Sequence, residues 1–205
     1  MSQPPFQPPF QAPQAPPPQQ APAQCVLTFV GPIEYPATKS FRSVCAGMAN
    51  SGVKKITLLL SSPGGSTVEG FALYHFLRAL PVELVTHNIG SIESIANVVF
   101  LAGSKRLCCA NTRFMIHGFS ATFRQQEMLD INQVAQRADS LEGDQSQFVE
   151  IFKRHTNMTD EMFDSIQPFK TATIFKTDKA KELGIIHEIA DASVPSGTPI
   201  LNIEF

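Results

Sequence analysis

Residues 88–103 read NIGSIESIANVVFLAG, and this stretch decides the predicted fold. The segment that leads into it, VELVTHNIG at 82–90, has the composition of a strand, whereas Ile95 to Ala102 has that of a short buried helix. The junction between them carries small and polar residues, namely Gly90, Ser91, Glu93 and Ser94. Ser94 or Ser91 at this position can cap the helix through its hydroxyl. Alternatively, Ser94 is a nucleophile on a strand-turn-helix turn.

Strand-like and helix-like runs alternate along the chain on both sides of this junction. Besides the helix after Ser94, we expect strands at 25–33, 55–60 and 82–90, two short ones within 105–118, and further strands at 171–175 and 185–190, with helices at 38–50, 67–80, 126–156, 158–166 and 177–183. This alternation predicts right-handed β-α-β units and a parallel sheet covered by helices. The strand KITLLL at 55–60 is nearly all apolar, which predicts that both of its faces are covered.

The chain divides into a tail, a domain and a C-terminal segment. Residues 1–24 are almost entirely Pro, Gln and Ala, so we expect disorder with polyproline II character. A docking peptide anchored by Phe6 and Phe10 is the alternative. Residues 25–192 form the predicted α/β domain, and 193–205 are too mixed for a prediction of strand or helix.

Composition and charge limit the classes of function. The 205 residues are 43% hydrophobic, which suffices for a core, and a net charge of −2 argues against a nucleic-acid partner. No apolar run reaches the roughly 18–20 residues that span a bilayer, and the N-terminus does not have the pattern of a signal peptide. The four cysteines form no C-x-x-C pair and no Cys/His cluster with zinc spacing. We therefore expect a cytoplasmic protein with free thiols and with no metal, other cofactor or membrane contact.

The segment SSPGGS at 61–66 lies between a predicted strand and a predicted helix. Adjacent glycines allow a sharp turn that leaves backbone N–H groups unobstructed by side chains, and the positive end of the helix dipole follows. Such a turn holds an anion or a developing oxyanion, although Gly-Gly pairs also occur in ordinary turns. If Ser94 is a nucleophile, the N–H groups of Gly65 and Ile95 are the candidates for holding the oxyanion.

His117 ends the apolar strand RFMI and is the candidate partner of Ser94. A histidine that leaves an apolar strand is more often structural than catalytic. A serine at a helix start and a histidine at the end of a neighbouring strand nevertheless form a workable nucleophile and base pair. The remaining histidines have no such setting and are expected on the surface or in packing contacts: His75, His87, His155 and His187.

Four motifs in order give a resemblance to a known family: SPGGS, THNIGSIESIANVVFLAG, R-x-MIH-G and AKELGII. Together they resemble the ClpP family of self-compartmentalised serine peptidases, over the range from about Val26 to Ile189. The resemblance implies the crotonase/ClpP-like spiral of β-β-α units. It also implies an extended handle helix, beginning near Gln126, that interlocks two heptameric rings.

The same resemblance implies roles for residues and a set of partners. Ser94 is the implied nucleophile and His117 the general base, with Gly65 and Ile95 as the oxyanion hole. The implied substrate is a peptide or an unfolded protein. Homo-oligomeric rings of seven or fourteen subunits and an AAA+ unfoldase are the implied partners.

The chain departs from the family pattern at the third position of the triad. Counting back from the AKELG motif, the position of the family's aspartate is Ala172, which has no carboxylate. In a triad the acid fixes the histidine tautomer and stabilises the imidazolium, and its loss costs about 10⁴ in kcat when nothing replaces it. Three solutions remain open: a hydroxyl of Thr171 or Thr173, a carboxylate of Asp164 or Asp178, or a Ser-His dyad.

Glu93 is a second departure, because the family has a small residue just before the serine. A carboxylate near a helix N-terminus is electrostatically stabilised, which favours a capping role. Alternatively, Glu93 shapes the substrate pocket or acts on the charge of His117. The family's glycine-rich strand after the histidine is reduced to GFSATF, in which Phe119 and Phe123 are expected to narrow the substrate groove.

Three functions compete on this evidence. The first is a serine endopeptidase, in which Ser94 forms an acyl-enzyme that water hydrolyses inside a ring chamber. The second is a catalytically impaired ring subunit with a structural or regulatory role, which Ala172 favours and the retained Ser94 and His117 disfavour. The third is a crotonase-type acyl-CoA enzyme, which would use the oxyanion hole on a thioester without the Ser94–His117 pair.

Overall fold

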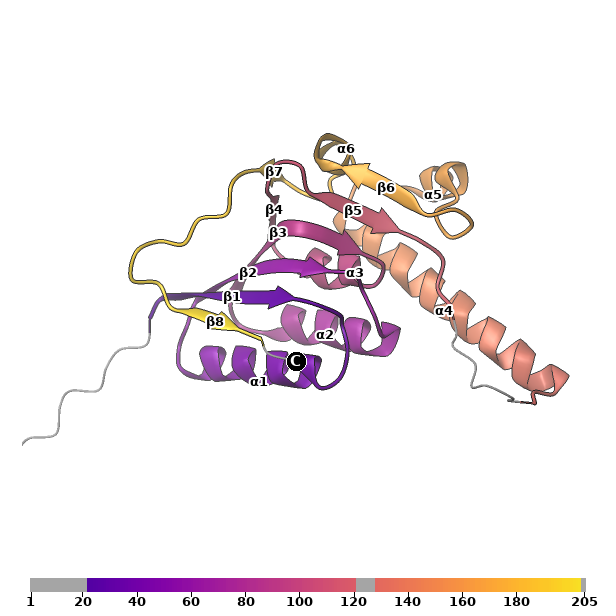
Figure 1. Ribbon diagram of the computed structural model, residues 1–205, viewed down its shortest axis with the longest axis horizontal. Helices are drawn as coiled ribbons and strands as arrows, with labels where there is room; N and C mark the ends of the chain where they lie inside the picture. Colours follow the sequence, from indigo (N-terminus) through magenta and orange to yellow (C-terminus); the bar gives the residue numbers. More distant parts are fainter. Residues whose placement is uncertain (1–21, 121–127, 204–205) are drawn as a thin grey trace, which may run out of the picture.

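The computed structural model describes residues 22–120 and 128–203, and within them eight strands form one sheet (Figure 1). The strand order is β6-β5-β3-β2-β1-β8, and β4 pairs with both β3 and β7. Every pair is parallel except β5 with β6. The strands are β1 (Gln24–Val30), β2 (Lys55–Ser62), β3 (Glu83–Glu93), β4 (Lys105–Cys108), β5 (Arg113–Ile116), β6 (Thr173–Lys176), β7 (Glu188–Ile189) and β8 (Ile200–Asn202).

The described part of the chain also contains six α-helices. They are α1 (Ala37–Asn50), α2 (Thr67–Ala79), α3 (Ala96–Leu101), α4 (Ile131–His155), α5 (Asp160–Ile166) and α6 (Thr177–Glu182). The predicted alternation of strands and helices is confirmed, with shifts at the ends: β3 runs on to Glu93, and the helix expected at Ser94 begins only at Ala96. None of these helices is long and apolar enough to cross a bilayer.

The long strand β3 has two successive neighbours on one side. Its first half pairs with β4 and its second half with β5. Asn88 bridges the split, because its side chain donates to the carbonyl of Arg113 at 3.0 Å and accepts from the N–H of Gly90 at 2.9 Å. The split brings the ends of β3 and β5 side by side, and Ser94 and His117 follow directly after these two ends.

Helices α1, α2 and α3 lie on one face of the sheet (Figure 1). On β2, the alternate residues Ile56, Leu58 and Leu60 are fully buried in one cluster with helix residues such as Phe41 and Leu73. The β2 residues between them are only half-buried, so the prediction that both faces of this strand are covered is wrong. Polar side chains on that second face explain the difference, because they tolerate water: Lys55, Thr57 and Ser61.

Helix α4 is anchored only in its C-terminal half, and its other half extends away from the sheet (Figure 1). Its buried side chains are Phe148, Ile151 and Phe152. Asp130 and Gln133 form a capping box at its start, which explains why the helix begins there. Ile131 in the first turn is 80% exposed. The predicted long helix is therefore present as a projecting element, but it begins at Ile131 and not near Gln126.

Phe119 belongs to the aromatic cluster beneath α4. Its ring lies edge-to-face on Phe148, with centroids 5.5 Å apart, and also contacts Phe169. Phe119 therefore packs against the core, which differs from the expectation that it narrows a substrate groove. Phe123, and the tail residues Phe6 and Phe10, lie outside the described residues.

Arg106 on β4 ties the C-terminal ends of α4 and α6 to the sheet. The residue is only 5% exposed, and its guanidinium donates to four backbone carbonyls, those of Gly103, His155, Gly184 and Ile185. The last carbonyls of a helix have no partner within the helix, so a cation there satisfies them and complements the helix dipole. Arg106 thereby holds the root of the projecting α4 in place.

The C-terminal segment adds the edge strand β8 to the sheet. β8 pairs in parallel with β1, and the N–H of Ile203 donates to the carbonyl of Thr28 at 3.0 Å. The sequence predicted no element here, because the three residues of β8 are exposed and show no alternation of apolar and polar side chains. This part of the chain thus shares the sheet with the predicted domain.

Candidate active site

Ser94 lies in a tight turn between β3 and α3. Its φ is 54°, in the left-handed region that non-glycine residues rarely adopt, and the residue is 7% exposed. Such a conformation costs about 1–3 kcal/mol and persists only where the surroundings enforce it. α3 has Ile95 as its N-cap and no capping side chain, so the hypothesis that Ser94 or Ser91 caps this helix is wrong. The geometry is that of a strained strand-turn-helix junction, which in hydrolases presents a nucleophile.

The SSPGGS turn packs directly against Ser94. A Cβ added to Gly64 would lie 2.6 Å from the Cβ of Ser94 and 2.9 Å from the carbonyl oxygen of Glu93. A Cβ on Gly65 would lie 2.6 Å from the carbonyl oxygen of Ile33. Both glycines also have a positive φ, of 92° and 146°. Both positions therefore require glycine. The Gly-Gly pair, which by itself is common in ordinary turns, is needed here because two backbone turns approach each other closely.

Two backbone N–H groups beside Ser94 are unused. The amides around Gly65 are occupied, since Ile33 donates to the Gly64 carbonyl at 2.7 Å and Ser66 donates to the Ile33 carbonyl at 2.9 Å. The N–H groups of Gly65 and Ile95 donate to no residue of the described chain. Two free donors next to a serine are the components of an oxyanion hole.

His117 follows the last residue of β5 and is half-buried. The N–H of Ser94 donates to the carbonyl of Met115 at 2.9 Å, which fixes the turn against β5 two residues before the histidine. The structure therefore brings Ser94 and His117 to the same edge of the sheet. Within the described residues the Ser94 hydroxyl makes no hydrogen bond, so none joins it to His117, as is common in unliganded sites.

Asn97 connects the two strand ends, and the sequence interpretation missed it. Its side-chain amide donates to the carbonyls of Ser94 and Met115, both at 2.9 Å, and the residue is completely buried. Its Oδ1 has no partner among the described residues. The available signal was a polar side chain inside the apolar run IANVVFLAG, because a buried amide has to be satisfied by a specific partner.

The imidazole of His117 is held by the main chain. Its Nδ1 lies 2.7 Å from the carbonyl oxygen of Gly118. A carbonyl oxygen only accepts hydrogen bonds, so the contact assigns the proton to Nδ1. In the neutral ring this leaves Nε2 with a free lone pair, which is the form that a general base requires.

No triad carboxylate faces His117 from β6. β5 and β6 pair antiparallel with Ile116 opposite Thr173, and continuation of this register by one pair puts Ala172 opposite His117. The Thr173 hydroxyl donates to the carbonyl of Thr171 at 3.3 Å, and the N–H of Thr171 donates to Gln167 at 3.2 Å. Neither threonine is hydrogen-bonded to His117 within the described chain.

The two alternative aspartates lie in helices α6 and α5. Asp178 is in the first turn of α6 and, with Asn111 and Arg113, lines a groove of about 490 Å³ at the start of β5, whereas His117 follows the other end of this strand. Asp164 is in α5, which the loop after Gln167 separates from β6. Within the described residues, neither carboxylate forms a hydrogen bond or an ion pair with His117.

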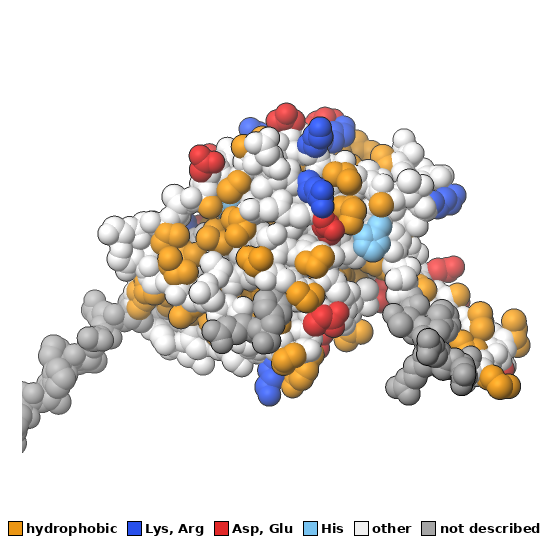
Figure 2. Space-filling model, viewed as in Figure 1, with side chains coloured by type: hydrophobic (Ala, Val, Ile, Leu, Met, Phe, Trp, Pro, Cys, Tyr) orange, Lys and Arg blue, Asp and Glu red, His pale blue; other side chains and the backbone are white. Residues whose placement is uncertain are grey.

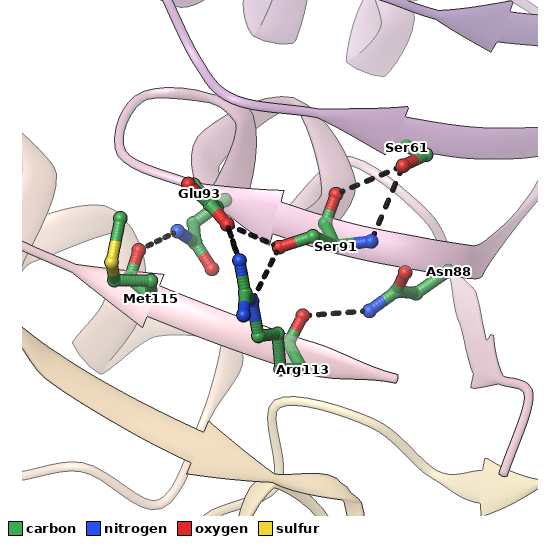
Figure 3. A network of polar contacts seen from close by, with 7 residues as sticks. Ser61, Asn88, Ser91, Glu93, Arg113 and Met115 are labelled. Carbon is green, nitrogen blue, oxygen red and sulfur yellow. Dashed lines mark hydrogen bonds and ion pairs between the residues drawn. The ribbon is translucent and has the colours of Figure 1, made fainter. Parts of the chain in front are cut away.

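Glu93 is bound by its neighbours on the sheet and does not cap α3 (Figure 3). Its Oε1 accepts from the Ser91 hydroxyl at 2.5 Å and from Nη2 and Nε of Arg113 at 2.9 and 3.3 Å. Burial opposes its ionisation, but the hydrogen bonds from Ser91 and Arg113, and then the charges of Arg113 and His117, lower its pKa below the ordinary value. Glu93 is therefore an anion beside the candidate nucleophile, and the capping interpretation is wrong.

Comparisons with known proteins agree with this geometry. The family model described as Clp protease matches residues 29–193. The chain is 26% identical over 143 residues to an ATP-dependent Clp protease proteolytic subunit of Deinococcus radiodurans, with 67% of this chain and 66% of that protein covered. It is 28% identical over 141 residues to an ATP-dependent Clp protease proteolytic subunit 3 of Rhodococcus jostii, with 68% and 67% covered. The alignments thus span about two thirds of the length of these relatives.

A solved structure shares the fold. A ClpP1 mutant from Listeria monocytogenes superimposes with a TM-score of 0.72 at 17% identity, over 82% of this chain and 91% of that one. The predicted ClpP-like α/β fold is confirmed by this match. Because the family model matches most of the chain, the chain belongs to the Clp protease family.

Proposed function

We propose that the protein is a serine endopeptidase in which Ser94 is the nucleophile and His117 the general base. The Ser94 Oγ attacks a peptide carbonyl carbon while its proton passes to Nε2 of His117. The carbonyl oxygen becomes an oxyanion that accepts hydrogen bonds from the N–H groups of Gly65 and Ile95. The C–N bond then breaks as His117 returns the proton to the leaving amine. Water, deprotonated by the same imidazole, hydrolyses the acyl-enzyme.

The observation that carries this proposal is the left-handed turn at Ser94. A serine that served only packing would have no reason to adopt a φ of 54° with two free N–H groups beside it. The contact to Gly118 puts a proton on Nδ1 of His117, and in the neutral ring this is the tautomer that accepts a proton at Nε2. Together these features supply a nucleophile, a base and an oxyanion hole at one edge of the sheet.

The assembly and the partners are proposed from the family. We infer a homo-oligomeric ring, of seven or fourteen subunits, that encloses the site and admits peptides or unfolded protein. The projecting half of α4 and its exposed Ile131 support such an assembly, because a free helix of this kind needs a neighbour. An AAA+ unfoldase would supply large substrates, and the cytoplasm is the proposed location.

A second candidate function is an impaired ring subunit with a regulatory role. Ala172 at the position opposite His117 favours it, since the residual activity of triads that lack their acid is low. The two candidates differ in one measurable property, namely whether Ser94 is activated.

Labelling of the purified full-length protein with a fluorophosphonate probe, followed by peptide mapping, measures that property. The proposal predicts modification at Ser94 that is lost in Ser94→Ala and reduced at least about 10³-fold in His117→Ala. Ser146→Ala, at a hydroxyl bonded to the carbonyl of Glu142 on α4, is the matched control and should label as the wild type does. A folded wild type that is not labelled contradicts the peptidase and favours the impaired subunit.

A further inference from the structure

The candidate site contains a carboxylate on a strand where the family pattern has none. Ala172, the residue before β6, lies opposite His117 when the β5–β6 register is continued by one pair, while β3 presents Glu93 immediately before the nucleophile. A triad aspartate performs two tasks: it fixes the histidine in one tautomer, and it stabilises the imidazolium that forms in the reaction. In this chain each task has its own candidate group.

We propose that these two tasks are divided between the Gly118 carbonyl, which fixes the tautomer of His117, and the Glu93 carboxylate, which stabilises its imidazolium. This inference rests on the proposed function, because an imidazolium forms only if His117 takes the proton of Ser94. Glu93 acts through His117 and is therefore a positioning residue, whereas His117 and Ser94 contact the reacting atoms.

Fixing the tautomer of His117 requires a hydrogen-bond acceptor at Nδ1, and this acceptor need not be charged. The Gly118 carbonyl oxygen, 2.7 Å from Nδ1, meets this requirement. Gly118 is itself held closely, since a Cβ at this position would lie 2.4 Å from the carbonyl oxygen of Phe169. The acceptor is thus part of a tightly packed backbone, and it keeps Nε2 free for the Ser94 proton.

The second task requires a negative charge on the same face of the sheet as His117. Glu93 is the register partner of Met115, and His117 lies two residues further along β5. Side chains alternate between the faces of a strand, so Met115 and His117 share the face of Glu93. A strand spacing of about 4.8 Å and a two-residue advance of about 6.6 Å put the Cα atoms of Glu93 and His117 about 8 Å apart. The Glu93 carboxylate leans back toward Ser91 and Arg113, so its charge acts on His117 across a gap and without contact. The charge of His117 is the smallest of the causes that lower the pKa of Glu93.

The contacts of Glu93 fix its carboxylate and leave one oxygen available. Ser91 and Arg113 bind only Oε1, and Oε2 accepts no hydrogen bond from the described residues (Figure 3). Figure 2 shows basic, acidic and imidazole side chains near one another on one face of the molecule. The side chain of Arg113 is 55% exposed and that of Glu93 only 14% exposed, so water screens the cation more than the anion. Arg113 therefore offsets less of the Glu93 charge than a buried cation would.

The rate of fluorophosphonate labelling tests whether the charge of Glu93 stabilises the imidazolium of His117. Glu93→Gln keeps the shape and the hydrogen-bonding capacity of the side chain and removes its charge. We expect the maximal labelling rate to fall about tenfold, the size of a moderately screened charge interaction across such a gap, with the probe concentration at half-maximal rate unchanged. Glu93→Asp should recover the rate to within about threefold of the wild type, because it restores the charge.

A matched control is available on the same strand. Glu83 pairs with Lys55 on β2, at the opposite end of β3 from the site, so Glu83→Gln removes a similar ion pair and should leave the labelling rate unchanged. Nitrogen-15 chemical shifts of labelled histidine test the first task. We expect the Nδ1–H tautomer of His117 in the wild type and in Glu93→Gln alike.

Each result has a defined meaning. A wild-type rate in Glu93→Gln, with labelling that still needs His117, overturns the inference and leaves the peptidase intact. Equal losses in Glu93→Gln and Glu93→Asp would assign the effect to packing and also overturn it, as would a change of tautomer in Glu93→Gln. Absence of labelling in the wild type would overturn the proposed function together with the inference.

Discussion

At the β3–α3 turn, Ser94 is held in a left-handed conformation with Gly64 pressed against it, whereas at the end of β5, His117 faces Ala172 and contacts a single main-chain carbonyl. The nucleophile half of the site is fixed by backbone contacts that leave no room for another atom. Among the described residues the His117 side chain makes one hydrogen bond, to the Gly118 carbonyl, and an exposed alanine stands in the position opposite the histidine.

This difference indicates which half of the site tolerates change. An added side chain between the two backbone turns would displace the reacting atoms. A displacement of about 1 Å lowers the reaction rate about 10²-fold. Electrostatic support of a base acts over a longer range and can come from more than one direction. The position of the missing aspartate, Ala172, is exposed and belongs to the base half, where a substitution is sterically tolerable.

The largest effect is expected from Gly64→Ala in the nucleophile half. The new Cβ would collide with Ser94 and with the carbonyl of Glu93, and alanine is strained at a φ of 92°. We expect a fall in the labelling rate of about 10²-fold or more, and a loss of about 1–3 kcal/mol in the free energy of unfolding, measured by urea denaturation. Gly47→Ala is the control, since a Cβ there meets nothing within 4 Å. Similar effects of the two substitutions would contradict the steric account.

A gain of activity is expected from Ala172→Asp in the base half. The position is exposed and opposite His117 in the continued register, so a carboxylate fits there and can accept a hydrogen bond from Nδ1–H in place of the Gly118 carbonyl. We expect the labelling rate to rise about tenfold, well below the full value of a triad acid, because Glu93 already supplies a negative charge. Ala172→Asn has the same shape without the charge and should bring no gain. Equal rates in the two variants would show that the base half does not limit the site.

A smaller effect is expected from Asn97→Leu, which removes the link between the two halves. The carbonyls of Ser94 and Met115 would each lose a hydrogen bond of 2.9 Å. We expect a loss of about 1–3 kcal/mol in the free energy of unfolding and a fall in the labelling rate that is smaller than that of Gly64→Ala. An unchanged rate in a destabilised variant would mean that the halves are positioned independently.

The smallest effect concerns stability alone and arises outside both halves. Burial, and then the charges of Arg78, Arg106 and Arg154, lower the pKa of His155 to about 4. Between about pH 6.5 and 4 the unfolded chain therefore binds more protons than the folded one, so the free energy of unfolding decreases as the pH falls. We expect His155→Gln to reduce the loss between pH 7 and pH 5 by about 1 kcal/mol, after allowance for solvent screening. An unchanged loss in urea denaturation would contradict this assignment.

The sequence predicted the nucleophile half in some detail because its constraints are local. The glycine pair and Ser94 each lie between a strand and a helix, and these elements are recognisable within about ten residues. The capping hypotheses for Ser94 and Glu93 were wrong because they depended on the first residue of α3, and helix ends are the least predictable feature of a pattern.

Features that depend on how strands distant in the sequence pair with one another could not be predicted from the sequence. The salt bridge of Glu93 with Arg113 exists because the second half of β3 pairs with β5, a split that no local pattern indicates. β8 is an edge strand of three exposed residues, so its sequence lacks an apolar face. The prediction for β2 failed for a related reason, since an apolar strand does not reveal which of its faces meets helices.

The structure of the protein after reaction with a fluorophosphonate tests the central claim most directly. We predict a covalent bond from phosphorus to the Oγ of Ser94 and a phosphonyl oxygen within hydrogen-bonding distance of the N–H groups of both Gly65 and Ile95. Modification of another residue, or a phosphonyl oxygen directed away from these two groups, would contradict the account of the site.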